Sequence, residues 1–150
     1  MKLKRTSLLF LASALIIIQC CVMVSARSSD YLDAYGVYLT PVSGGKIVFT
    51  ADVNALRTMT KVGVTKLYLY ESKNGRDFYL IKSYNYEDYP IMMGSGLYYY
   101  EDIITYNGTP GYKYYANAFC YAGDSTGYDE KAYSTAIKTC LLYTSPSPRD

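Results

Sequence analysis

Histidine is absent from the 150 residues of this chain, and its absence removes several chemistries at once. Nucleophilic machinery of the Ser-His-Asp or Cys-His kind needs an imidazole base, and histidine is also the commonest zinc ligand. A hydrolytic enzyme would therefore have to use paired carboxylates. The neighbouring acids Glu101-Asp102 and Glu87-Asp88 do not supply a pair, because consecutive strand residues point to opposite faces. We therefore expect no catalytic residue and no enzymatic activity.

Three other positions could carry chemistry. Residues 124–130 bring Asp124, Asp129 and Glu130 near a loop, but their spacing differs from that of an EF-hand, so we interpret the segment as a solvated turn. Cys120 is predicted to point inward, which favours a small buried hydrophobe over a reactive thiol. Residues 107–109 fit an N-glycosylation sequon, yet turn chemistry is sufficient to explain them. We expect neither a metal nor a cofactor.

Tyrosine is the one unusual residue type, with 20 copies in a chain that has no tryptophan. It offers a large, stiff contact area with a polar tip and is favoured in binding surfaces. It also fits strands well and can simply cover a sheet, so a structural role stays open beside a binding role. Strand alternation turns several tyrosines away from the aliphatic side chains. The predicted binding face comprises Tyr68, Tyr70, Tyr79, Tyr115 and Tyr121.

The elements that must position these tyrosines are strands. Residues 64–84 alternate with a two-residue period on both sides of Asn74-Gly75, a dipeptide typical of a tight hairpin turn. The segment 46–53 alternates in the same way, with Ile47, Phe49, Ala51 and Val53 on its inward face.

Further strand candidates follow the same pattern, and no segment carries a helical stripe. They are 34–39, which ends at Pro41 and suits an edge, and then 96–105, 112–121 and 128–138. The strand 112–121 should turn Tyr114, Ala116, Ala118 and Cys120 to one side. Loops are expected at 54–63 and 123–127. About seven strands separated by turn signals predict an all-β fold, a single antiparallel β-sandwich.

The succession of segments 46–53, 64–84, 110–118 and 132–138 resembles the B strand, the C and C′ hairpin, the F strand and the G strand of a fibronectin type III or related immunoglobulin-like domain. This resemblance implies an immunoglobulin-like sandwich in which the hydroxyl of Tyr114 ties back to nearby backbone. Two features depart from the family. Phe49 replaces its core tryptophan, and residues 107–111 differ from its usual F-strand entry. The chain also resembles small exported proteins of gut Clostridia with no assigned activity, which implies export.

The first 26 residues have the order of a secretory signal peptide: a basic head, an apolar run and small residues at the end. Gln19 interrupts the apolar run, which favours export with cleavage over a transmembrane anchor. Lipidation at Cys20 or Cys21 is a second alternative, although large residues precede these cysteines where a lipobox needs small ones. We expect the mature chain to begin at Arg27.

The last eleven residues, 140–150, match codon for codon the in-frame translation of a transposase adapter used to build sequencing libraries. We therefore expect 140–150 to be a sequencing-adapter artefact, with a genuine Ser/Pro-rich tail as the alternative, and 27–139 to be one domain. Cys120 is then the single cysteine of that domain, so no disulfide can form within it. Its eleven basic and twelve acidic residues give a net charge of −1, which provides no basic footprint for nucleic acid.

These observations predict a secreted, extracellular module that binds a protein or glycan at the cell surface through its tyrosine-rich face. It should bind no nucleic acid, and no membrane once the signal is removed. The alternative is a structural spacer domain of a longer exported protein that is cut off after Thr139.

Overall fold

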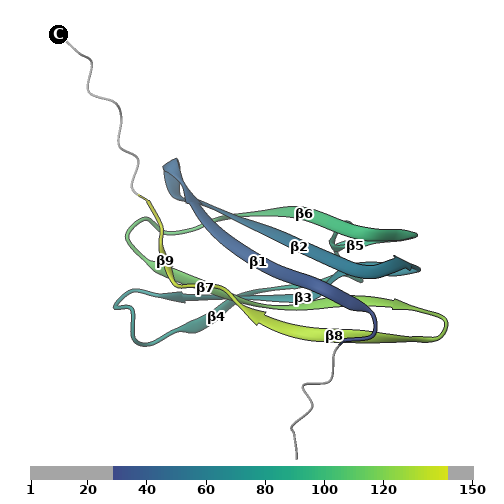
Figure 1. The fold of residues 1–150 in the computed structure, drawn as a ribbon. Coiled ribbons are helices and arrows are strands. Elements are labelled where there is room, and N and C mark those ends of the chain that lie inside the picture. Colours follow the sequence, from purple (N-terminus) through teal and green to yellow (C-terminus); the bar gives the residue numbers. More distant parts are fainter. Residues whose placement is uncertain (1–28, 142–150) are drawn as a thin grey trace, which may run out of the picture.

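The computed structural model describes residues 29–141, which form two antiparallel β-sheets stacked face to face (Figure 1). The predicted signal peptide lies outside the described residues, as does the predicted adapter segment beyond Leu141. Within the described residues, no helix is long and apolar enough to cross a membrane.

The smaller sheet has three strands in the order β1-β2-β6, and the larger has six, with the path β4-β3-β7-β8. The strands of the smaller sheet are β1 (Leu32–Val42), β2 (Lys46–Met59) and β6 (Leu97–Asn107). Those of the larger are β3 (Lys61–Ser72), β4 (Tyr79–Asn85), β5 (Met93–Gly94), β7 (Lys113–Asp124), β8 (Gly127–Ser134) and β9 (Lys138–Thr139). Two 3₁₀ turns, η1 (Ser43–Gly45) and η2 (Pro90–Met92), complete the elements. The all-β sandwich is confirmed. Seven strands are long, and the two additional ones, β5 and β9, are two-residue pairings that no alternation could reveal.

The core lies between the sheets and is built from alternate residues of the facing strands. On β2 the inward residues are Ile47, Phe49, Ala51 and Val53, all at most 7% exposed, as predicted. On β7 the predicted inward set of Tyr114, Ala116, Ala118 and Cys120 is fully buried. Burying one large apolar side chain such as Phe49 stabilises the fold by roughly 1.5–3 kcal/mol. Small alanines opposite large residues let the sheets approach closely.

The predicted loop at 54–63 is wrong. β2 continues to Met59 and β3 begins at Lys61, so the chain crosses from one sheet to the other at Thr60. Ala55 is buried at 7% exposure, so the inward alternation continues one position past Val53. The next three residues are exposed and the pairing with β6 shifts register before Met59, which is buried again at 1% exposure. Gly63 lies inside β3, and glycine is needed there because a Cβ would overlap the carbonyl of Met92.

The hairpin of β3 and β4 is confirmed, but its turn differs from the tight two-residue turn that was predicted. The strands are joined by a loop over residues 73–78, in which only Gly75 has a positive φ, of 75°. The Asn74 side chain accepts hydrogen bonds from the backbone N–H groups of Arg76 and Asp77 at 2.9 and 3.0 Å. In such an Asx-type turn, asparagine is favoured because its side chain accepts backbone hydrogen bonds. Its tolerance of positive φ plays no part here, because Asn74 has a negative φ.

The two C-terminal strands also differ from expectation. The loop predicted over 123–127 shrinks to the two residues between β7 and β8. The strand predicted over 128–138 is interrupted after Ser134. Thr135 turns inward there, and its hydroxyl accepts a hydrogen bond from the N–H of Ala116 at 2.9 Å.

The packing continues one residue beyond Thr139. Cys140 is 2% exposed and exchanges backbone hydrogen bonds with Gly111 and Tyr112. Cys120 and Cys140 are both free and buried. The adapter origin of residue 140 onward stays a prediction, because it concerns where the residues come from and not how they pack.

Candidate functional site

The candidate site is the outer side of the larger sheet, where aromatic side chains follow one another along β3, β7 and β8. Strand register places directly paired residues on one side of a sheet, so the outward rows can be followed from one strand to the next. We call this surface the tyrosine face. Its residues are Tyr68, Tyr70, Phe78, Tyr115, Phe119, Tyr121 and Tyr128.

Tyr70 and Tyr115 form the tightest contact of this surface. They stand opposite each other on β3 and β7, and their rings stack with centroids 4.7 Å apart at 5°. Phe78, from the hairpin loop, meets Tyr115 edge-on at 5.0 Å. Such pairs stabilise by about 0.5–1.5 kcal/mol beyond the area they bury. The two tyrosines that the sequence assigned to different strands therefore lie in direct contact.

Two more aromatic pairs continue the row along the sheet. Tyr68 meets Phe119 edge-on at 6.1 Å, and Tyr121 stacks on Tyr128 at 5.4 Å. Tyr128 is 63% exposed, whereas Tyr68 and Tyr121 are half-buried. The surface is thus a succession of paired rings, with ring edges and hydroxyl tips available to a partner.

Tyr79 does not join this surface. It is paired with Glu71, which is paired in turn with the inward-facing Tyr114, so Tyr79 belongs to the other side of the sheet. A β-bulge between Leu69 and Tyr70 shifts the β4 register and leaves Leu80 opposite Tyr70. Tyr79 is 69% exposed, beyond the edge of the core. A bulge has no reliable sequence signature, so the alternation of β4 was assigned to the wrong face.

Three residues of the surface were missed by the sequence analysis. Phe119 alternates in step with Tyr115 and Tyr121, so the pattern of β7 already contained it. Phe78 and Tyr128 had no such signal, because their positions depend on the hairpin loop and on the two-residue β7–β8 turn.

The polar groups of this surface are mixed in charge. By their register, Lys61, Lys66 and Lys113 lie on the same side of the sheet as this surface, and Glu130 stands opposite Tyr121. Lys61 Nζ lies 5.1 Å from the ring centroid of Tyr86, within the range of a cation–π contact. Burial raises the pKa values of Tyr115 and Tyr121, with neighbouring tyrosines adding to the effect. Both hydroxyls are therefore neutral and can donate as well as accept hydrogen bonds.

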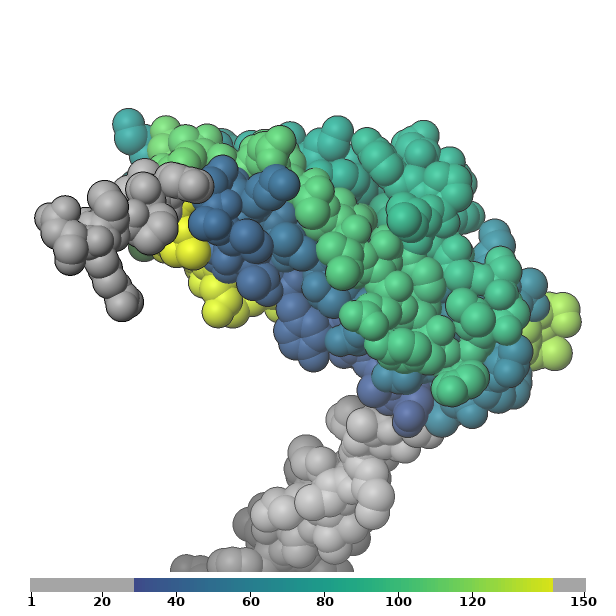
Figure 2. Space-filling model, turned by 90° about the horizontal axis from the view of Figure 1, so that it is seen from above, coloured from purple at the N-terminus to yellow at the C-terminus, as the bar shows by residue number. Residues whose placement is uncertain are grey.

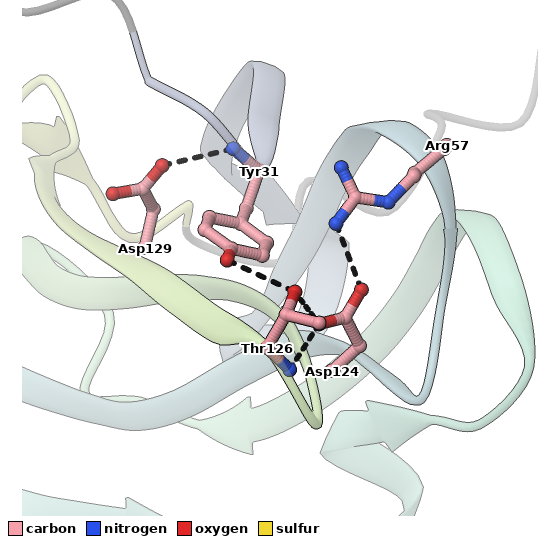
Figure 3. Close-up of polar contacts among 5 residues, drawn as sticks. All are labelled: Tyr31, Arg57, Asp124, Thr126 and Asp129. Carbon is pink, nitrogen blue, oxygen red and sulfur yellow. Dashed lines mark hydrogen bonds and ion pairs between the residues drawn. The ribbon is translucent and has the colours of Figure 1, made fainter.

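The acidic residues on either side of the β7–β8 turn form hydrogen bonds and an ion pair within the protein (Figure 3). Asp124 accepts hydrogen bonds from Thr126 Oγ1 at 2.5 Å and from the Thr126 N–H at 2.8 Å, and it pairs with Arg57 at 2.9 Å. These contacts lower the pKa of Asp124 to about 2, the Thr126 hydroxyl contributing most. Glu130 accepts a hydrogen bond from Thr65 at 2.5 Å.

Asp129 ties the start of the described chain to β8. One of its oxygens accepts hydrogen bonds from the Ser29 hydroxyl at 2.5 Å and from the Asp30 and Tyr31 N–H groups at 2.8 and 3.0 Å. Figure 3 shows the Asp129 carboxylate facing the Tyr31 backbone and the Asp124 carboxylate facing Arg57 and Thr126. Within residues 29–141, no group of three or more acidic, cysteine or histidine side chains is arranged to hold a metal ion.

The remaining candidate groups for chemistry are separated by the fold. Glu101 and Asp102 lie on opposite sides of β6, as expected, and one buried oxygen of Asp102 has no hydrogen-bond partner in the described chain. Glu87 and Asp88 lie in the turn after β4 and not on a strand, which corrects the position assumed for them. Burial raises the pKa of Cys120 to about 12, so its thiol stays protonated at neutral pH.

A scan against protein-family models finds no match to this chain, and a search of curated proteins finds none either.

Proposed function

We propose that this chain is a fibronectin type III-like binding module of an exported protein, and that it engages a protein or glycan at the cell surface through the tyrosine face. The observation that carries this proposal is the run of aromatic pairs on the outer side of the larger sheet, away from the core between the sheets. Aromatic side chains are enriched in binding surfaces because they bring large contact areas at low entropic cost.

Two features support the fibronectin type III-like part of the proposal. The strand orders β1-β2-β6 and β4-β3-β7-β8 correspond to the family order A-B-E and C′-C-F-G. The Tyr114 hydroxyl accepts a hydrogen bond from the Thr109 N–H at 2.7 Å, the backbone tie that the resemblance implies for this position.

A spacer domain is the second candidate, and the ring pairing itself supports it. Because Tyr70 and Tyr115 stack on each other, each covers part of its neighbour's ring and could serve only to shield the sheet. The two functions predict different effects of removing the rings. A binding module would lose its ligand, whereas a spacer domain would change only in stability.

The test replaces both stacked rings, in the double variant Tyr70→Ser with Tyr115→Ser. Retention is measured on purified bacterial cell walls, before and after protease treatment, so that glycan and protein partners are distinguished. We expect the variant to lose retention while its free energy of unfolding falls by less than the roughly 3–5 kcal/mol that truncation of a buried aromatic residue costs. The matched control is Tyr79→Ser with Tyr98→Ser, two exposed tyrosines outside the tyrosine face, which should be retained normally.

Three outcomes would reject this function. If the wild-type domain is not retained, or if the control loses retention equally, the tyrosine face is not a binding surface. If the test variant loses roughly 3–5 kcal/mol, as truncation of buried aromatics does, its tyrosines are structural and the spacer reading is preferred.

A further inference from the structure

The outer side of the smaller sheet contains a concave surface, on the opposite side of the sandwich from the tyrosine face. It is a hollow of about 340 Å³ over β1, β2 and β6. Figure 2 looks down on this side of the molecule, with β1 in blue and β6 in green. Its lining includes Gly36, Tyr38, Asp52, Asn54 and Tyr99.

Gly36 is the residue of β1 beside which the hollow lies. It is paired with Asp52, which is paired with Glu101, so these three residues form one outward row across the sheet. A Cβ at Gly36 would lie 3.1 Å from the Tyr38 hydroxyl, which shows that the Tyr38 side chain reaches across the glycine. Because Gly36 has no side chain, the Tyr38 ring lies over the backbone of β1 at this point, and Gly36 itself is buried beneath it.

Tyrosines stand on both sides of this row. Tyr38 belongs to the next row in one direction and is 52% exposed, and Tyr99 belongs to the next row in the other direction and is 41% exposed. Tyr35 also lines the hollow, but its ring packs edge-on against Tyr133 at 6.4 Å. Two aromatic side chains therefore border a carboxylate at the centre of the hollow.

The charge of this surface is negative. Tyr99 Oη lies 3.1 Å from Glu101 Oε2 and 3.3 Å from Asp52 Oδ1, so one hydroxyl is shared between two carboxylates. The Glu101 hydrogen bond is the main cause that raises the pKa of Tyr99 to about 12, which keeps this phenol protonated. In the described chain neither carboxylate has a basic side chain within ion-pair distance, and no basic residue lines the hollow.

We propose that this hollow binds an alkylammonium cation. A carboxylate attracts the positive charge, and tyrosine rings attract a cation through their negative faces while covering its methyl or methylene groups. A site of this kind excludes anions by repulsion. A neutral ligand of equal shape would gain only the apolar part of the interaction.

The test is a titration followed by two-dimensional amide NMR, with choline as the cation and 3,3-dimethyl-1-butanol as its neutral isostere. We expect choline to shift the amide signals of Gly36, Asp52 and Tyr99 saturably, and the isostere to bind at least about fivefold more weakly. The methylamide of Nα-acetyl-lysine presents an ammonium group as a peptide would. Whichever cation binds more tightly identifies a small molecule or a peptide as the source.

Substitutions assign the effect to the hollow. Asp52→Asn and Tyr38→Ala should each weaken choline binding about fivefold or more, while Tyr38→Phe retains the ring and the affinity. Glu87→Gln removes an exposed acid from a distant turn and should change nothing. The amide spectrum of each variant shows whether it folds, and Glu101→Gln replaces Asp52→Asn if that variant does not.

Equal affinity for choline and its isostere would overturn the proposal, because the site would then be apolar and indifferent to charge. Unchanged binding in both Asp52→Asn and Tyr38→Ala would do the same. Saturable shifts confined to the tyrosine face would place cation binding there, and the absence of saturable shifts would exclude the site.

Discussion

The Asp124 carboxylate shows how one side chain organises the turn between β7 and β8. It accepts two hydrogen bonds from Thr126 and pairs with Arg57, which extends from β2 of the other sheet. Arg57 in turn lies 5.2 Å from the ring centroid of Tyr31. The two-residue turn, the start of the described chain and the two sheets therefore meet at this acid (Figure 3).

The lowered pKa of Asp124 predicts an acid-dependent loss of stability. Its pKa falls from the usual 3.8 to about 2 in the folded chain, so its contribution is complete above pH 3.8 and is lost as the pH falls towards 2. We expect Asp124→Asn to be less stable than the wild type at pH 6 and to lose less stability between pH 5 and pH 2. Urea unfolding midpoints across this range measure the effect.

The control for this prediction is Asp88→Asn, an exposed acid in the turn after β4. It should follow the wild-type pH dependence. If Asp124→Asn also follows it, the contacts of Asp124 with Thr126 and Arg57 do not couple folding to protonation.

At the scale of elements, the β3–β4 hairpin shows the importance of one loop glycine. Gly75 has a φ of 75°, and its N–H donates to the Ser72 hydroxyl at 2.8 Å. A side chain at this φ costs about 1–2 kcal/mol for most residues, whereas asparagine tolerates it better. The nearest neighbour is the flexible end of Lys113, which can move aside.

We therefore expect Gly75→Ala to lower the free energy of unfolding by about 1–2 kcal/mol and Gly75→Asn to lower it by less. Urea denaturation of the two variants measures the difference. Because alanine is the smaller residue, a steric cause would reverse the order. A larger loss for Gly75→Asn would therefore show that space, and not backbone conformation, sets the requirement for glycine.

The elements also show what could be predicted from sequence. The alternation of β2 and β7 reflects burial on one side of each strand, so residues such as Phe49 and Ala116 were assigned correctly. The bulge opposite Leu69 and Tyr70 was not predictable, because an extra residue in β4 leaves no mark on the composition, and Tyr79 was therefore assigned to the wrong side of the sheet. The hollow was missed because Gly36 and Tyr99 come together only through the register of three strands.

At the scale of the whole molecule, Tyr114 links the two sheets at one end of the sandwich. It is fully buried on β7, its hydroxyl accepts the Thr109 N–H at 2.7 Å, and that hydroxyl donates to the carboxylate of Glu71. Thr109 lies in the connection from β6 to β7, so the contact links the smaller sheet to the larger. A Cβ at Gly108 would lie 3.1 Å from the Tyr114 ring, which shows how closely the connection covers it.

We expect Tyr114→Phe to destabilise the chain by about 1–3 kcal/mol, because it leaves the Thr109 N–H and the Glu71 carboxylate without this partner while keeping the ring. The free energy of unfolding in urea measures the loss. The matched control is Tyr106→Phe, a partly buried tyrosine whose ring lies 6.4 Å from that of Tyr114. Its hydroxyl forms no hydrogen bond within the described chain, so we expect its removal to be nearly neutral.

A substitution at Glu71 distinguishes the contribution of the Tyr114–Glu71 hydrogen bond from that of the Thr109–Tyr114 hydrogen bond. Tyr114→Phe leaves the partly buried Glu71 carboxyl group without this hydrogen-bond partner, whereas the double variant with Glu71→Leu removes the polar group that lacks a partner. The double variant should therefore recover part of the stability lost in Tyr114→Phe. If Tyr114→Phe is as stable as Tyr106→Phe, the hydroxyl is dispensable, and ring packing alone holds the two sheets together at this end.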